Sequence, residues 1–137
     1  MGKTLFALNL VDGLGENGYK TLLCELEMTE QSLGMRRLSY NANVEAEKMK
    51  FGKLSEKEIL KIFEATNILS KRNNMFTDCT PGQSLLSIKS KAKAIQQTHG
   101  LDVVVIDHLT LMNIPEKGTR DLAIGEITEE LKSIFMN

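Results

Sequence analysis

The clearest indication of the fold is the run Val103-Val104-Val105-Ile106-Asp107, in which four apolar residues are followed by an acid. An unbroken apolar run of this kind is typical of a central strand in a parallel sheet that helices cover on both faces. Two more short runs, Thr21–Leu26 and Met75–Asp78, predict further strands. The segments between them carry apolar residues at helical spacing. Strands that alternate with helices indicate an α/β fold with a mainly parallel sheet flanked by helices.

Local signals predict where the helices begin. Thr29, Ser55 and Ser84 each precede such a segment and have the side chain of an N-cap. Glu58 stands three residues after Ser55, which is the spacing of a capping box. The first helix, over residues 5–14, is apolar nearly all round, so we expect it to be packed on more than one side.

Composition excludes several classes of protein. The 137 residues, 42% hydrophobic and 26% charged, suit one globular domain. No apolar run approaches the ~18 residues of a membrane span, and the N-terminus does not resemble a secretory signal. Cys24 and Cys79 are far apart and indicate reduced thiols, so we expect a cytoplasmic protein without membrane contact. A net charge of -1 means that any nucleic-acid contact must come from a local patch.

Gly2-Lys3-Thr4, followed at once by an apolar helix, is the second half of a P-loop. Glycine lets the backbone approach a phosphate, and the first N–H groups of the helix point at the anion. Lys3 would neutralise the β- and γ-phosphates of ATP, and the Thr4 hydroxyl would coordinate Mg²⁺. The alternative is an ordinary helix start with Lys3 in solvent.

Two acids follow predicted strands and complete this pattern. Asp107 ends the apolar run as a Walker-B acid does, and would hold Mg²⁺ through water. Glu27 follows the strand at residues 21–26 and could orient the attacking water. The alternative interpretation is a solvated acid near the start of the next helix. Glu25, two residues earlier on the same face of an extended strand, could compete for that role and ranks below Glu27.

The first glycine of the P-loop and the strand that feeds it are not in the sequence. Either the chain is a piece of a longer protein, or the motif is accidental. Phe135-Met136-Asn137 ends inside or just after a helix expected from Thr119 or Asp121, which favours truncation at both ends. Since the feeding strand would lie beside the strand at 103–106, we expect the 137 residues alone to lack ATPase activity and to expose an aggregation-prone edge.

The residues that support an ATPase also carry a family resemblance. Five blocks, in order and at about the family's spacing, resemble the DnaB-type replicative helicases: residues 1–9, 26–29, 78–82, 99–101 and 105–112. The resemblance implies that residues 1–137 are part of a RecA-like P-loop ATPase domain. It also implies a ring-shaped homohexamer around single-stranded DNA, with a primase and a helicase loader bound through regions outside this chain.

The resemblance assigns roles to matching positions. Lys3 and Thr4 match the lysine and the hydroxyl residue of the family's P-loop. Glu27 matches the glutamate that polarises the attacking water, and Asp107 matches the Walker-B acid. Arg120 resembles the arginine that opens the helix after a DNA-facing loop.

Three positions depart from the family pattern. This chain has Glu25 where the family usually has serine, His108 where it usually has tyrosine, and Thr110 where it usually has glutamine. The last change puts in doubt any coupling role of that side chain.

The loop at residues 114–120 contains Lys117 and Arg120 beside a glycine. These cations could follow a phosphate backbone, or the loop is simply polar and exposed.

The function expected from these residues is that of an ATP-dependent replicative helicase motor that moves 5′-to-3′ on single-stranded DNA, the direction being implied by the resemblance alone. The alternatives are a recombinase- or clock-type ATPase that is not a helicase, and an assembly module that does not hydrolyse ATP.

Overall fold

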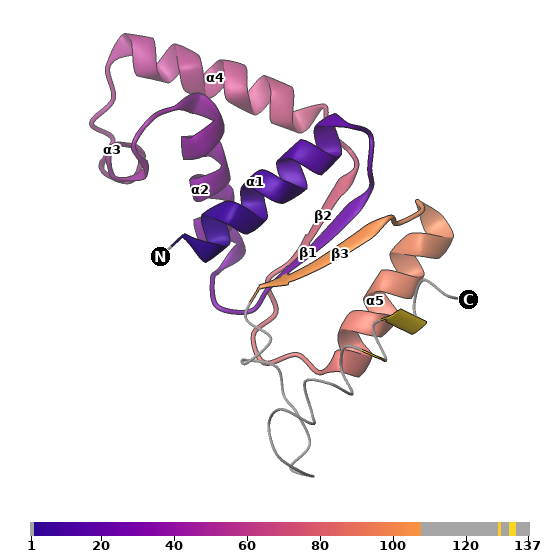
Figure 1. Ribbon diagram of the computed structural model, residues 1–137. Coiled ribbons are helices and arrows are strands. Elements are labelled where there is room, and N and C mark those ends of the chain that lie inside the picture. The colour runs from indigo at the N-terminus through magenta and orange to yellow at the C-terminus, as the bar shows by residue number, and fades with distance from the viewer. Residues whose placement is uncertain (1, 108–128, 130–131, 134–137) are drawn as a thin grey trace.

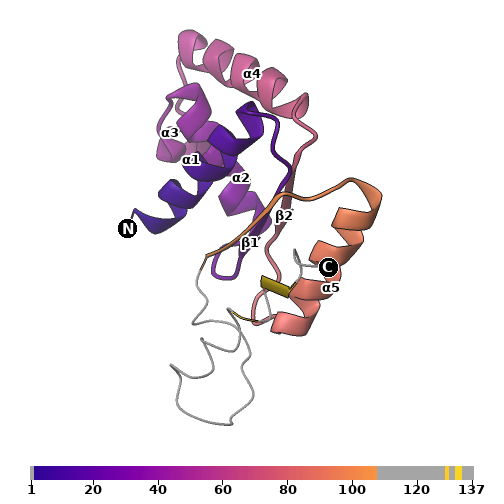
Figure 2. The ribbon, with the colours of Figure 1, turned by 45° about the vertical axis from the view of Figure 1, so that its right-hand side comes forward.

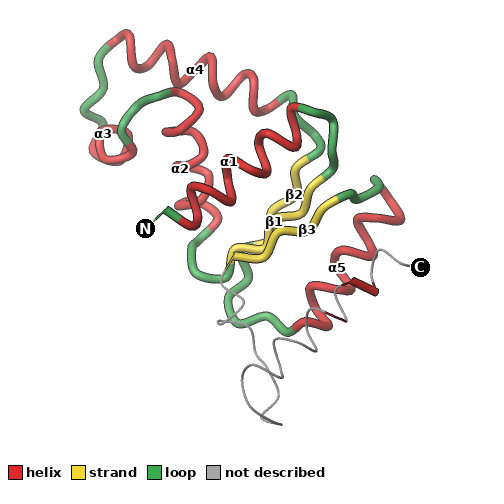
Figure 3. The backbone as a smooth tube through the Cα atoms, viewed as in Figure 1, coloured by secondary structure: helices red, strands yellow, loops and turns green. Residues whose placement is uncertain are grey.

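The computed structural model describes residues 2–107, 129, 132 and 133. Its strands are β1 (Thr21–Glu25), β2 (Met75–Asp78) and β3 (Val103–Asp107). They form a parallel sheet in the order β2-β1-β3 (Figures 1 and 3). This confirms the predicted α/β class. The helix expected from Thr119 or Asp121, and the loop that precedes it, lie almost wholly outside the described residues.

Helices cover both faces of the sheet. Within the described part of the chain they are α1 (Lys3–Glu16), α2 (Glu30–Ala42), α3 (Ala46–Phe51), α4 (Glu56–Ser70) and α5 (Leu85–Thr98). Figure 2 shows α1 and α5 on opposite sides of the strands, with α2, α3 and α4 grouped on the α1 side. None of the described helices is both long enough and apolar enough to cross a membrane.

Side chains alternate between the two faces along each strand, as the pleat requires. Leu22, Cys24 and Val104 face α5, whose Ile88 and Ala92 are fully buried against them. On the other face, Leu23 and Val105 pack with Ala7, Leu8 and Val11 of α1. The sheet therefore has a hydrophobic core on each side, and α1 packs against β1 and β3.

The predicted helix starts are confirmed. Thr29, Ser55 and Ser84 are N-caps, and each accepts a hydrogen bond from the backbone N–H three residues later. Ser55 and Glu58 form a complete capping box. These interactions are local, which explains why they are visible in the sequence.

The middle strand of the described sheet is β1, all five residues of which are buried. Strand β3 lies at the sheet edge with its apolar residues partly buried, which agrees with the unpaired edge expected for residues 103–106. One packing expectation is wrong within the described residues. Helix α1 buries one side only, and Phe6 on its other side is 69% exposed. An apolar run indicates which faces are covered, but strand order depends on long-range pairing that the run does not encode.

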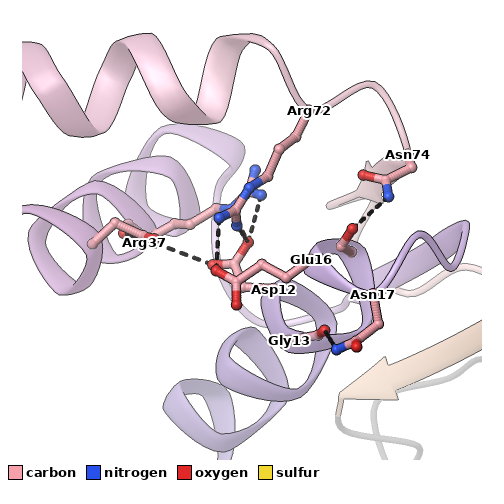
Figure 4. A network of polar contacts seen from close by, with 9 residues as sticks. Asp12, Gly13, Glu16, Asn17, Arg37, Arg72 and Asn74 are labelled. Carbon is pink, nitrogen blue, oxygen red and sulfur yellow. Dashed lines mark hydrogen bonds and ion pairs between the residues drawn. The ribbon is translucent and has the colours of Figure 1, made fainter.

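A polar network joins α1, α2 and the end of α4 (Figure 4). Asp12 of α1 is 6% exposed. One of its carboxylate oxygens accepts hydrogen bonds from Arg37 Nε at 2.9 Å and Nη2 at 2.5 Å, and from Arg72 Nη1 at 3.4 Å. The other oxygen accepts from Asn41 Nδ2 at 3.1 Å. Arg72 also reaches the exposed Glu16 at 2.7 Å. A single carboxylate thus ties together three segments that are distant in the sequence.

We expect Asp12→Asn to destabilise the protein by about 1–3 kcal/mol, because it removes the counter-charge of the largely buried Arg37 guanidinium and one of the two carboxylates that pair with Arg72. Urea denaturation followed by circular dichroism measures this loss. Glu16→Gln is the matched control and should change the free energy of unfolding by less than about 1 kcal/mol, since its ion pair is exposed. Equal effects of the two substitutions would contradict the central role of Asp12.

Candidate active site

Helix α1 begins with backbone donors that no side chain caps. Gly2 is its N-cap, and it makes no side-chain hydrogen bond to the first turn. Gly2 and Lys3 are exposed, whereas Thr4 is buried. The first turn contains no acidic residue. The positive end of the helix dipole and its N–H groups are therefore suited to an anion.

The loop between β1 and α2 presents Glu27. Strand β1 ends at Glu25 rather than at Leu26, and the chain bends before it enters α2 at Thr29. The N–H groups of Glu27 and Met28 donate to Glu25 Oε1 at 2.8 and 3.2 Å. The expectation that Glu25 and Glu27 share one face of an extended strand is therefore wrong. Glu25 is fully buried, and Glu27 is exposed beyond the bend.

Thr4 and Glu27 line one cavity of about 600 Å³, so the structure brings these two predicted site residues together. The same cavity is lined by Arg36 of α2 and Lys50 of α3, two cations that suit a negatively charged ligand. Sequence reasoning missed both, because an isolated basic residue on a helix has no signature. Only the packing of α2 and α3 beside the start of α1 places them there.

Each described strand ends at or next to an acid, and the three acids differ in their partners. Asp78 at the end of β2 contacts the Lys91 ammonium and accepts hydrogen bonds from the amide and hydroxyl of Thr80 at 3.0 and 2.7 Å. Burial works to raise the pKa of Asp78, but Lys91 and Thr80 outweigh it and hold that pKa below its usual value. Asp78 is therefore an ionised structural acid whose charge is compensated by Lys91.

Glu25 and Asp107 lie opposite each other on β1 and β3. They continue the alternation of Leu23 and Val105, which places them on the α1 face of the sheet. Glu25 is 0% exposed and Asp107 8%. Burial raises the pKa of Glu25, and a hydrogen bond with the Asp107 side chain and the charge of Asp107 raise it further, against the effect of the two backbone N–H donors.

One oxygen of each carboxylate, Glu25 Oε2 and Asp107 Oδ2, is buried and accepts no hydrogen bond from a described N–H or O–H donor, and the two side chains lie close enough to share a proton. Two facing carboxylates with orphaned oxygens fit a bound cation, because a cation would satisfy both.

The other predicted site residues either do not line this cavity or lie outside the described residues. Lys3 and Asp107 are not among the residues that line the cavity of Thr4 and Glu27. The predicted DNA-contacting residues Lys117 and Arg120, and the two family departures His108 and Thr110, lie outside the described residues.

Comparison with known families decides the family to which this chain belongs. The model of the DnaB-like helicase C terminal domain matches residues 1–137. The chain belongs to this family.

Curated relatives of this DnaB-like domain are replicative helicases. The replicative DNA helicase DnaB of Buchnera aphidicola subsp. Baizongia pistaciae is 34% identical over 137 residues, and the replicative DNA helicase DnaC of Bacillus subtilis is 33% identical. Each alignment covers 98% of this chain and 30% of the relative. The chain thus spans less than a third of the length of these relatives.

Solved structures confirm the RecA-like fold class of the DnaB-like domain. A structure described as an ATPase domain superposes with a TM-score of 0.86 at 27% identity, over 98% of this chain and 49% of the other. A structure described as a DnaB-like replicative helicase and its interactions with primase gives a TM-score of 0.85 at 27% identity, over 98% of this chain and 33% of the other. The parallel sheet and its flanking helices are therefore those of a DnaB-like ATPase domain.

Proposed function

We propose that residues 1–137 form part of the ATP-hydrolysing motor of a replicative DNA helicase. One observation carries the proposal: in a DnaB-like domain, Thr4 from the P-loop segment and Glu27 from the β1–α2 loop line the same cavity. Thr4 would reach the metal and phosphate end of ATP, and Glu27 would reach the water that attacks it.

The P-loop segment binds the phosphates in this proposal. Gly2 allows close approach of the backbone, and the uncapped first turn of α1 donates N–H groups to the anion. Lys3 supplies a positive charge to the β- and γ-phosphates. Arg36 and Lys50 add positive charge to the same cavity.

Thr4 and Asp107 are the residues proposed to hold Mg²⁺, and the orphaned Oδ2 of Asp107 fits that role. When bound, Mg²⁺ supplies charge that neutralises the oxygens of the transferred phosphoryl group. Glu27 accepts a hydrogen bond from the attacking water and orients it toward the γ-phosphorus. Lys3 stabilises the negative charge that develops in the transition state.

The partners are proposed from the family. The domain would act as a homohexamer on single-stranded DNA in the cytoplasm, with Lys117 and Arg120 as candidate phosphate contacts. A primase and a helicase loader would bind through regions outside residues 1–137. Support for the primase comes from the solved relative described with its primase interactions.

Unwinding of forked DNA by the full-length protein tests the proposal. We expect ATP-dependent unwinding of a fork with a 5′ single-stranded tail, stimulation of ATP hydrolysis by single-stranded DNA, and no unwinding with a non-hydrolysable ATP analogue. Hydrolysis without unwinding would favour a recombinase- or clock-type ATPase. ATP binding without hydrolysis would favour an assembly module.

A further inference from the structure

Glu25 has no role in the hydrolysis proposed above, although it is the most buried acid among the described residues. It stands in the middle strand of the described sheet, at the strand end that faces the start of α1. A buried carboxylate is costly unless a positive charge or several hydrogen bonds compensate it. Its surroundings therefore indicate what it binds.

The orientation of the Glu25 carboxylate is set by the protein. Oε1 accepts hydrogen bonds from the N–H groups of Glu27 and Met28. Oε2 accepts none from a described N–H or O–H donor, and the Glu25 carboxyl lies within hydrogen-bond reach of Asp107, so the two acids can share a proton until a cation replaces it. Asp107, its register partner on β3, likewise has one orphaned oxygen. The free oxygens thus belong to a preorganised pair of carboxylates on neighbouring strands.

Other buried or partly buried acids in the described chain have a basic partner. Asp12 binds Arg37 and Arg72, and Asp78 contacts Lys91. Neither Glu25 nor Asp107 forms an ion pair with a described lysine or arginine.

We propose that Glu25 is a second carboxylate of the divalent-cation site formed with Asp107, and that it lets this protein bind Mg²⁺ or Mn²⁺ before nucleotide arrives. The inference rests on the proposed function, because that function assigns Asp107 to the metal ion. Hard divalent cations prefer carboxylate oxygens, and an additional ligand charge raises their affinity.

Mn²⁺ binding to the nucleotide-free, full-length protein tests this inference, with free Mn²⁺ measured by electron paramagnetic resonance. Glu25→Gln keeps the side-chain volume and an oxygen that can accept from the Glu27 and Met28 amides, so it removes mainly the charge. We expect it to weaken Mn²⁺ affinity by about 10–100-fold. Glu64→Gln, at an exposed position of α4, is the matched control and should leave Mn²⁺ affinity unchanged.

A wild-type level of Mn²⁺ binding in Glu25→Gln would overturn the inference. Thermal unfolding of the wild-type protein provides a second readout, which does not depend on whether the variant folds. Mn²⁺ without nucleotide should raise the unfolding temperature of the wild-type protein. The absence of any rise at millimolar Mn²⁺ would also overturn the inference. Failure of the proposed function would look different, because wild-type protein would then neither bind nor hydrolyse ATP, whatever its Mn²⁺ affinity.

Discussion

Replacing Lys3 by alanine in the full-length protein is expected to abolish ATP turnover and to weaken nucleotide affinity by roughly 10²-fold or more, since it deletes a charge that faces the β- and γ-phosphates. Lys3 is exposed at the start of α1, so the substitution should leave the fold intact. Equilibrium binding of a fluorescent ATP analogue and a phosphate-release assay measure the two effects.

Lys53→Ala is a suitable control, because Lys53 is also an exposed lysine, lies between α3 and α4, and does not line the cavity of Thr4 and Glu27. It should retain wild-type binding and turnover. Nucleotide affinity that survives in Lys3→Ala would mean that Gly2-Lys3-Thr4 is an ordinary helix start rather than a phosphate site.

Glu27→Gln should separate binding from chemistry. We expect ATP to bind with nearly wild-type affinity while hydrolysis falls by about 10²–10⁴-fold, the usual contribution of one acid–base group. The amide keeps the size of the side chain but orients and polarises water poorly. Single-turnover hydrolysis, measured beside ATP binding, gives both quantities for the same preparation.

Glu30→Gln is the matched control, because Glu30 is an exposed acid in the first turn of α2, three residues beyond Glu27. It should hydrolyse ATP at the wild-type rate. Loss of ATP binding in Glu27→Gln as severe as in Lys3→Ala would argue against this division of labour. Full turnover in Glu27→Gln, combined with none in Glu25→Gln at saturating Mg²⁺, would transfer the water-orienting role to Glu25.

Local chemistry made much of this protein predictable. Thr29, Ser55 and Ser84 cap helices through bonds that span three residues, and the runs at 21–26 and 103–107 are apolar enough to be recognised as strands. The P-loop segment and the two candidate site acids, Glu27 and Asp107, likewise stand out as short motifs. Each of these signals lies within a few residues of the element or group that it predicts.

Tertiary structure decided what depends on distant segments. Pairing over long sequence separations made β1 the middle strand of the described sheet, and the same register set Glu25 opposite Asp107. Packing of α2 and α3 beside α1 brought Arg36 and Lys50 to the cavity of Thr4 and Glu27. Local sequence thus specifies the helices, the strands and the chemical groups that they carry. Only the parallel pairing and the helix packing, whose energy comes from contacts between distant segments, determined which of those groups meet.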